Sequence, residues 1–145
     1  MATSHLDNRH RGVIASTMMT FQPGEVTIAV DTELRYLTRD PFAVRVIFTL
    51  PGNPPVEWVF ARDLLVTGLH APSGVGDVQV FPAREGLRID LASPAGAAEL
   101  LADLDEVASF VAETMRLVPL GAESDYLDLD LEVGMLAEPP SFGVS

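Results

Sequence analysis

Alternation of apolar and polar residues is the feature that most constrains the fold of this chain. Between residues 42 and 50, apolar side chains occupy every second position, with Arg45 and Thr49 among the residues between them. This period of two predicts a β-strand with one buried face. Further strands are predicted at 12–21, 26–36, 56–60, 77–81, 86–91 and 97–101, although the last segment fits a short helix nearly as well. The fold must therefore bury about seven one-sided strands.

Helical spacing appears mainly in the second half of the chain. Apolar residues recur every three or four positions between 104 and 118, Asp103 and Glu106 resemble a capping box, and Pro119 ends the segment. One or two helical turns are expected at 62–69, and a last acidic helix at 125–138. The predicted class is α+β, with two antiparallel sheets of about seven strands packed against two or three helices.

Length and composition indicate one domain. The chain has 145 residues, 48% of them hydrophobic, which is enough for a single buried core. We expect this domain at 12–138, with a flexible tail at 1–11 and a frayed end at 139–145. No apolar run reaches membrane-spanning length, the first residues lack the apolar segment of a signal peptide, and there is no cysteine. A cytoplasmic protein is expected, not a membrane protein.

The charge is strongly asymmetric. The net charge is −12, and residues 99–145 carry eleven acids but only one base, Arg116. Nucleic-acid affinity depends mainly on cations that neutralise phosphates, and this chain has nine arginines and no lysine. Nucleic-acid binding is therefore not expected.

No constellation of residues predicts catalysis. His5 and His10 fall in the expected tail and His70 stands alone in a loop, so no metal site is predicted. There is no nucleophile elbow, and the glycine-rich turn at 73–76 leads into a strand without a lysine, unlike a phosphate loop. We expect no enzyme activity and no cofactor.

Two groups of residues have competing interpretations. Asp125, Asp128, Asp130 and Glu132 form either a solvated acidic face or a surface for a basic partner. Trp58, the only tryptophan, lies between Val56 and Phe60 in an alternating segment, which favours a core position over an exposed stacking platform.

Several segments carry a family resemblance. The most specific is VEWVFARDLLVTGLHAPSGVGDVQVFP at 56–82, and others are ELRY at 33–36, DPFAV at 40–44, LASPAG at 91–96 and the region 118–138. Over 26–138 the chain resembles the SsgA/SsgB-like proteins, sporulation-specific cell-division regulators of filamentous actinobacteria, and its tail resembles the SsgB type. Phe42, Gln79 and Phe81 replace the family's usual Tyr, Arg and Trp.

The resemblance implies more than the residues do alone. It implies a whirly-like fold, a homotrimer, and a non-catalytic protein that marks septum sites and recruits the tubulin-like division protein FtsZ and other septum proteins. Because related whirly folds bind single-stranded nucleic acid, such binding is the alternative function. Six signature positions are expected to be structural: Trp58, Phe60, Arg62, Asp63, Gly76 and Asp77.

Overall fold

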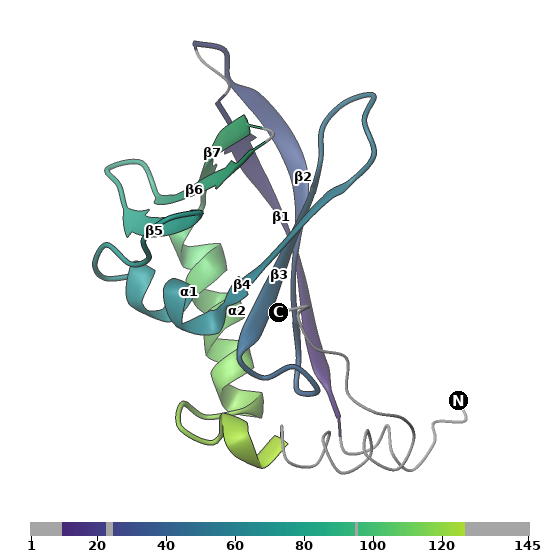
Figure 1. Ribbon diagram of the computed structural model, residues 1–145, viewed down its shortest axis with the longest axis vertical. Coiled ribbons are helices and arrows are strands. Elements are labelled where there is room, and N and C mark those ends of the chain that lie inside the picture. Colours follow the sequence, from purple (N-terminus) through teal and green to yellow (C-terminus); the bar gives the residue numbers. More distant parts are fainter. Residues whose placement is uncertain (1–9, 23–24, 95, 127–145) are drawn as a thin grey trace.

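The computed structural model describes residues 10–22, 25–94 and 96–126 (Figure 1). Within these residues the chain forms seven strands, the two helices α1 and α2, and one helical turn at 123–126. In chain order they are β1 (Gly12–Phe21), β2 (Ile28–Leu37), β3 (Ala43–Thr49), β4 (Val56–Ala61), α1 (Arg62–Gly68), β5 (Val78–Pro82), β6 (Leu87–Ser93), β7 (Gly96–Ala102) and α2 (Leu104–Leu117). The predicted α+β class and the number of strands are confirmed, and 97–101 belongs to a strand.

The prediction of two sheets is wrong, because all seven strands form one antiparallel sheet in the order β4-β3-β2-β1-β7-β6-β5. Strand β1 pairs with β2 along its whole length and with β7 only at its end, through Thr20–Leu101 and Phe21–Leu100. This short junction lets β5–β7 turn away from the longer strands, so the sheet is strongly curved and barrel-like (Figure 1).

The predicted alternation is present in β3. Val44, Val46 and Phe48 are buried, while Thr49 is exposed. The row begins one step later than predicted, because Phe42 precedes the strand in a turn and is exposed. Side chains point to opposite faces of the sheet in turn only within a pleated strand, so this alternation does not extend to a residue in the preceding turn.

Helix α2 closes the core. Val107, Phe110 and Val111 are buried within the same apolar cluster as the inward-facing residues of the strands. The Asp103 side chain accepts a hydrogen bond of 2.9 Å from the Glu106 N–H, which confirms the predicted N-cap. The Glu106 carboxylate accepts a hydrogen bond from the Thr17 hydroxyl of β1, so it links the start of α2 to the sheet.

No helix in the described part of the chain has both the length and the apolar character needed to cross a bilayer. The expected helix at 125–138 and the expected C-terminal tail lie largely or wholly outside the described residues, although residues 123–126 are helical. At the other end, the His10 ring and the Arg11 backbone both contact the Thr38 hydroxyl.

Helix α1 packs very closely on β5. Gly68 is buried, and a Cβ atom at this position would lie 2.3 Å from Cγ1 of Val80 and 3.1 Å from its carbonyl oxygen. The glycine therefore allows the end of α1 to approach the sheet more closely than any other residue would.

We expect Gly68→Ala to destabilise the protein although alanine is the better helix former. The added methyl group must displace Val80, and such overpacking costs about 1–3 kcal/mol of unfolding free energy. Denaturant unfolding measures this cost. The control is Thr67→Ala at the adjacent exposed position, which should change stability by less than about 0.5 kcal/mol. Equal stability of Gly68→Ala and wild type would contradict the close packing.

Candidate functional site

The signature positions in β4 and at the start of α1 have different roles. Phe60 is buried, and Trp58, for which a core position was predicted, is half-buried and packs against the core from the edge strand. Asp63 is exposed in the first turn of α1, where a carboxylate interacts favourably with the helix dipole. The first two side chains therefore stabilise the fold from the edge strand, and the third supports a helix start.

Two further signature positions shape the turn before β5. Gly76 has a φ of 85°, which favours glycine, and nothing lies within 4 Å of where its Cβ would be. Asp77 is exposed, and its carbonyl oxygen accepts a hydrogen bond of 2.8 Å from the Ala92 N–H. The hydrogen bond between Asp77 and Ala92 joins the turn to β6.

Arg62 is the least expected of the signature residues, because its side chain is only 1% exposed. Its Nη1 donates hydrogen bonds to the carbonyl oxygens of Thr114, at 3.2 Å, and Val118, at 2.8 Å. Its Nη2 donates to Oε2 of Glu123 at 2.6 Å. These bonds tie the start of α1 to the end of α2 and to the segment that follows it.

The environment of Arg62 changes the titration of two neighbours. Burial opposes ionisation of Glu123, but hydrogen bonds from Arg62 and from the Gly121 N–H outweigh it and lower the pKa of the carboxyl below its usual 4.5. The guanidinium also lies 5.0 Å from the centre of the Tyr36 ring. Burial raises the pKa of Tyr36 to about 12, although the charge of Arg62 opposes this rise.

The Glu123 ion pair predicts a specific acid sensitivity. The pKa of Glu123 is lower in the folded protein than its usual 4.5. The stabilisation that the ion pair gives to the folded state is therefore complete above pH 4.5, and it is lost as the pH falls through the folded-state pKa. Glu123→Gln should therefore be less stable than wild type at pH 7, and the difference should shrink as pH falls below about 4.5.

Thermal melting of both proteins from pH 7 to pH 3 measures this difference. The matched control is Glu113→Gln, which removes a carboxylate from the exposed pair with Arg116 and should leave the profile unchanged. A constant gap between Glu123→Gln and wild type across this range would show that the ion pair does not titrate as expected.

The outer face of β1–β4 is open and carries ion pairs along the strands. Arg35 binds Glu33 through Nη2 at 2.7 Å, and Arg45 binds Glu57 at 3.0 Å. Large apolar side chains lie among these charges: Ile14 is 62% exposed, Met18 57% and Val59 48%. This mixture of exposed apolar groups and paired charges is typical of a surface that contacts another protein.

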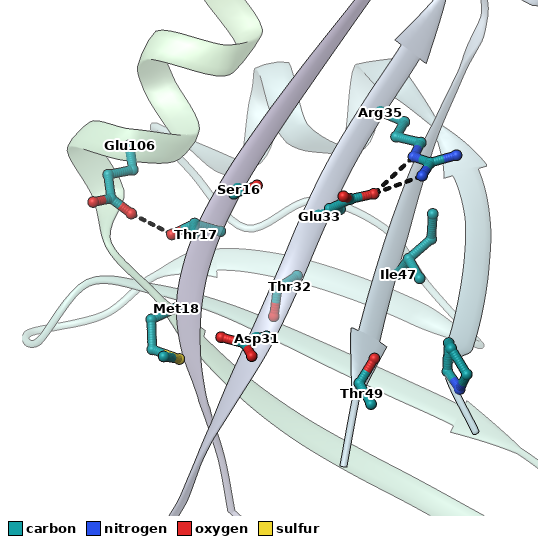
Figure 2. Close-up of a pocket in the computed structure, with 11 residues that line it drawn as sticks. Ser16, Thr17, Met18, Asp31, Thr32, Glu33, Arg35, Ile47, Thr49 and Glu106 are labelled. Carbon is teal, nitrogen blue, oxygen red and sulfur yellow. Dashed lines mark hydrogen bonds and ion pairs between the residues drawn. The ribbon is translucent and has the colours of Figure 1, made fainter. Parts of the chain in front are cut away.

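A groove of about 630 Å³ crosses this part of the sheet (Figure 2). In Figure 2, Glu33 and Arg35 point toward one another, and Glu106 reaches β1 from α2. The groove is lined by residues of β1, β2, β3, the segment before β4, and α2: Ser16, Thr17, Met18, Asp31, Thr32, Glu33, Arg35, Ile47, Thr49, Pro55 and Glu106. Its lining combines hydroxyls, carboxylates and apolar groups, which suits binding of a polar chain segment.

The structure places only one of the acidic residues predicted to bind partners. Asp125 is exposed, and Asp128, Asp130 and Glu132 lie outside the described residues. Sequence reasoning missed the groove, because its residues come from three strands and a helix. The only signal was the polar row of each alternating strand, which does not reveal which rows become neighbours. Among the described residues, no group of three or more His, Asp or Glu side chains could hold a metal ion.

Comparison with known proteins places this arrangement among cell-division proteins. The family model described as "Streptomyces sporulation and cell division protein, SsgA" matches residues 30–123. The sporulation-specific cell division protein SsgB of Streptomyces coelicolor is 45% identical over 119 residues, which are 79% of this chain and 87% of that protein. SsgB of Thermobifida fusca is 38% identical over 115 residues, or 77% of this chain and 83% of that protein.

Two solved structures are also similar. A crystal structure of an SsgA-like sporulation-specific cell division protein from Thermobifida fusca superposes with a TM-score of 0.80, at 33% identity over 94% of this chain and 99% of that chain. A structure from work on SsgB mutations and longitudinal cell division during sporulation of Streptomyces coelicolor gives 0.78, at 39% identity over 86% of this chain and 99% of that chain.

Proposed function

Because this chain belongs to the SsgA family of sporulation and cell division proteins, we propose that it acts without catalysis as an SsgB-type regulator that marks septum sites and recruits FtsZ. The observation that carries the proposal is the match to SsgB proteins along most of the chain. Its place of action would be the cytoplasmic side of the division septum. A regulator of this kind works through surfaces, and the chain offers two candidates.

The first candidate is the acidic C-terminal region. Asp125 is exposed where the described chain ends, and Asp128, Asp130 and Glu132 follow it in the sequence. Carboxylates at this density steer a basic partner and set the salt dependence of its binding. We assign this region to septum partners, with FtsZ as the first to test.

Neutralising Asp125, Asp128 and Asp130 together, each to Asn, should weaken binding to purified FtsZ or to another septum protein, and more so at low salt. On this proposal the three carboxylates face solvent, so stability should barely change. Co-sedimentation with FtsZ and a melting curve measure the two effects. A fluorescent fusion of the wild-type chain in its native cell should form ladder-like foci before septa appear.

The matched control changes Asp63 and Asp77 to Asn and Glu85 to Gln; all three residues are exposed, and the variant loses the same total charge. Normal FtsZ binding by the Asp125, Asp128 and Asp130 variant would show that this region is only a solvated surface. A fusion that is uniformly distributed throughout septation would contradict the septum role itself.

The second candidate is a self-association surface on the edge strand. We propose a homo-oligomer, with a trimer as the expected size, that uses β4 and its neighbour β3. Val59 is exposed on β4, and Ile47 of β3 is only half-buried on the same outward face. An edge strand with exposed apolar side chains is the usual template for pairing with another chain. Oligomerisation would bury both.

Val59→Arg should therefore shift the protein toward the monomer, because a buried unpaired charge is costly at an interface. Light scattering at micromolar concentration measures the change in mass. The control is Val75→Arg, in the loop before β5, where the side chain is already 92% exposed. A wild-type monomer under these conditions would contradict self-association. An unchanged oligomeric mass for Val59→Arg would show that Val59 is not part of the interface.

Nucleic acid is not the ligand we propose. The arginines of the strands are engaged by carboxylates: Arg35 by Glu33, Arg45 by Glu57, and Arg88 by Asp90 and Glu99. Phosphate binding needs cations that are available to release counterions, and these pairs would have to break first.

A further inference from the structure

We propose that the groove across β1, β2 and β3 binds an extended basic peptide segment of a partner protein. This surface is separate from the acidic C-terminal region and does not depend on the identity of the septum partner. Four properties of the groove support the proposal. They are its exposed apolar side chains, its carboxylates that no cation neutralises, the position of Met18 directly opposite Asp31, and its length.

Exposed apolar area is concentrated where β1 borders the groove. Met18 and Ile14 lie on the same outward face of β1, each with more than half of its side chain exposed. Single exposed apolar residues are common and need no explanation. Here, however, Met18 lines the groove directly, and Ile14 lines a hollow that continues it. Apolar groups placed in a depression, rather than scattered, mark a contact surface.

The charge of the groove is negative. Its carboxylates are Asp31, Glu33 and Glu106, and its one cation, Arg35, is held by Glu33 through two contacts of 2.7 and 2.9 Å. Within the described part of the chain, the exposed side chain of Asp31 forms no hydrogen bond or ion pair. An unpaired carboxylate in a depression attracts a cationic group from outside the protein.

The geometry pairs an apolar group with a carboxylate. Met18 and Asp31 are direct partners in the β1–β2 register, and both side chains point outward. Residues in this relation have Cβ atoms about 4.5–5.5 Å apart. Arginine and lysine have an apolar stem and a charged head, so one such residue can lay its stem on Met18 and direct its head to Asp31. Methionine adapts well to such a stem.

The length of the groove favours a peptide over a small ligand. A hollow of about 390 Å³ shares Met18, Asp31 and Thr49 with it and continues to the loop at 50–53. Another hollow, of about 430 Å³, shares Ser16 and Glu106 with it and continues along α2 to Glu113. The three hollows form one path across the sheet, which an extended segment with spaced side chains can follow.

Charge also decides between possible occupants. Nucleic acid would bring phosphates, which the carboxylates of the groove repel, whereas a basic segment is attracted. The partner is therefore a protein with arginine or lysine residues spaced by apolar ones.

The test uses the full chain and a fluorescein-labelled synthetic peptide that alternates arginine with alanine and leucine. Fluorescence anisotropy measures its affinity at low and at physiological salt, and a peptide with glutamate in place of arginine is the ligand control. Asp31→Asn and Met18→Ser should each weaken binding by about two- to fivefold, the size of one exposed contact. Asp63→Asn removes the same charge on α1, outside the groove, and should not change the affinity measurably. Melting curves verify that the variants are folded.

Three outcomes would overturn the proposal. Equal weakening by Asp31→Asn and Asp63→Asn would mean that only bulk charge attracts the peptide. No difference between the arginine and glutamate peptides would exclude a basic ligand. A change of oligomeric mass on Met18→Ser, with peptide affinity unchanged, would show that the groove holds a second copy of the chain.

Discussion

The burial of one arginine organises the helical side of this protein. Arg62 is the first residue of α1, directly after β4, and the hydrogen-bond partners of its side chain lie 52, 56 and 61 residues later in the chain. Two of them are carbonyl groups at the end of α2: that of Val118 lies where a helix leaves carbonyls without intrahelical partners, and that of Thr114 also accepts the Val118 N–H. A cation at that end is also favoured by the helix dipole. Breaking a buried ion pair by removing one partner typically costs about 3–5 kcal/mol, so these elements depend on one another.

The position of the helices determines which face of the sheet is available. Helix α2 and the inward rows of the strands share one apolar cluster, which leaves the opposite face of β1–β4 open. That open face carries the paired charges, the exposed Met18 and Val59, and the groove. A protein that acts through contacts needs such a face to be rigid. On the covered side, the Arg62 contacts join the start of α1 to the end of α2.

Local pattern predicted the elements, and long-range pairing decided their arrangement. The alternation in β3 and the capping of α2 by Asp103 could be read from neighbouring residues, because strand period and helix capping are local properties. The single sheet could not, because it depends on two residue pairs between β1 and β7 that are about eighty positions apart in the chain. Arg62 was recognised as a signature position, but its partners were not, since no local feature connects it with Glu123.

The same distinction applies to the surface. Twenty-one acids and nine arginines make an excess of carboxylates certain from composition alone, but composition does not say which of them remain unpaired. In the strands, Arg35 and Arg45 each bind a carboxylate of their own or an adjacent strand, whereas Asp31, on the same face of β2 as Arg35, has no such partner among the described residues. Because each pair removes one acid from the surface potential, the unpaired ones define where a cation is attracted. For the proposed binding of a basic segment, Asp31 is therefore the carboxylate of the groove that the arginines leave free to attract a cation.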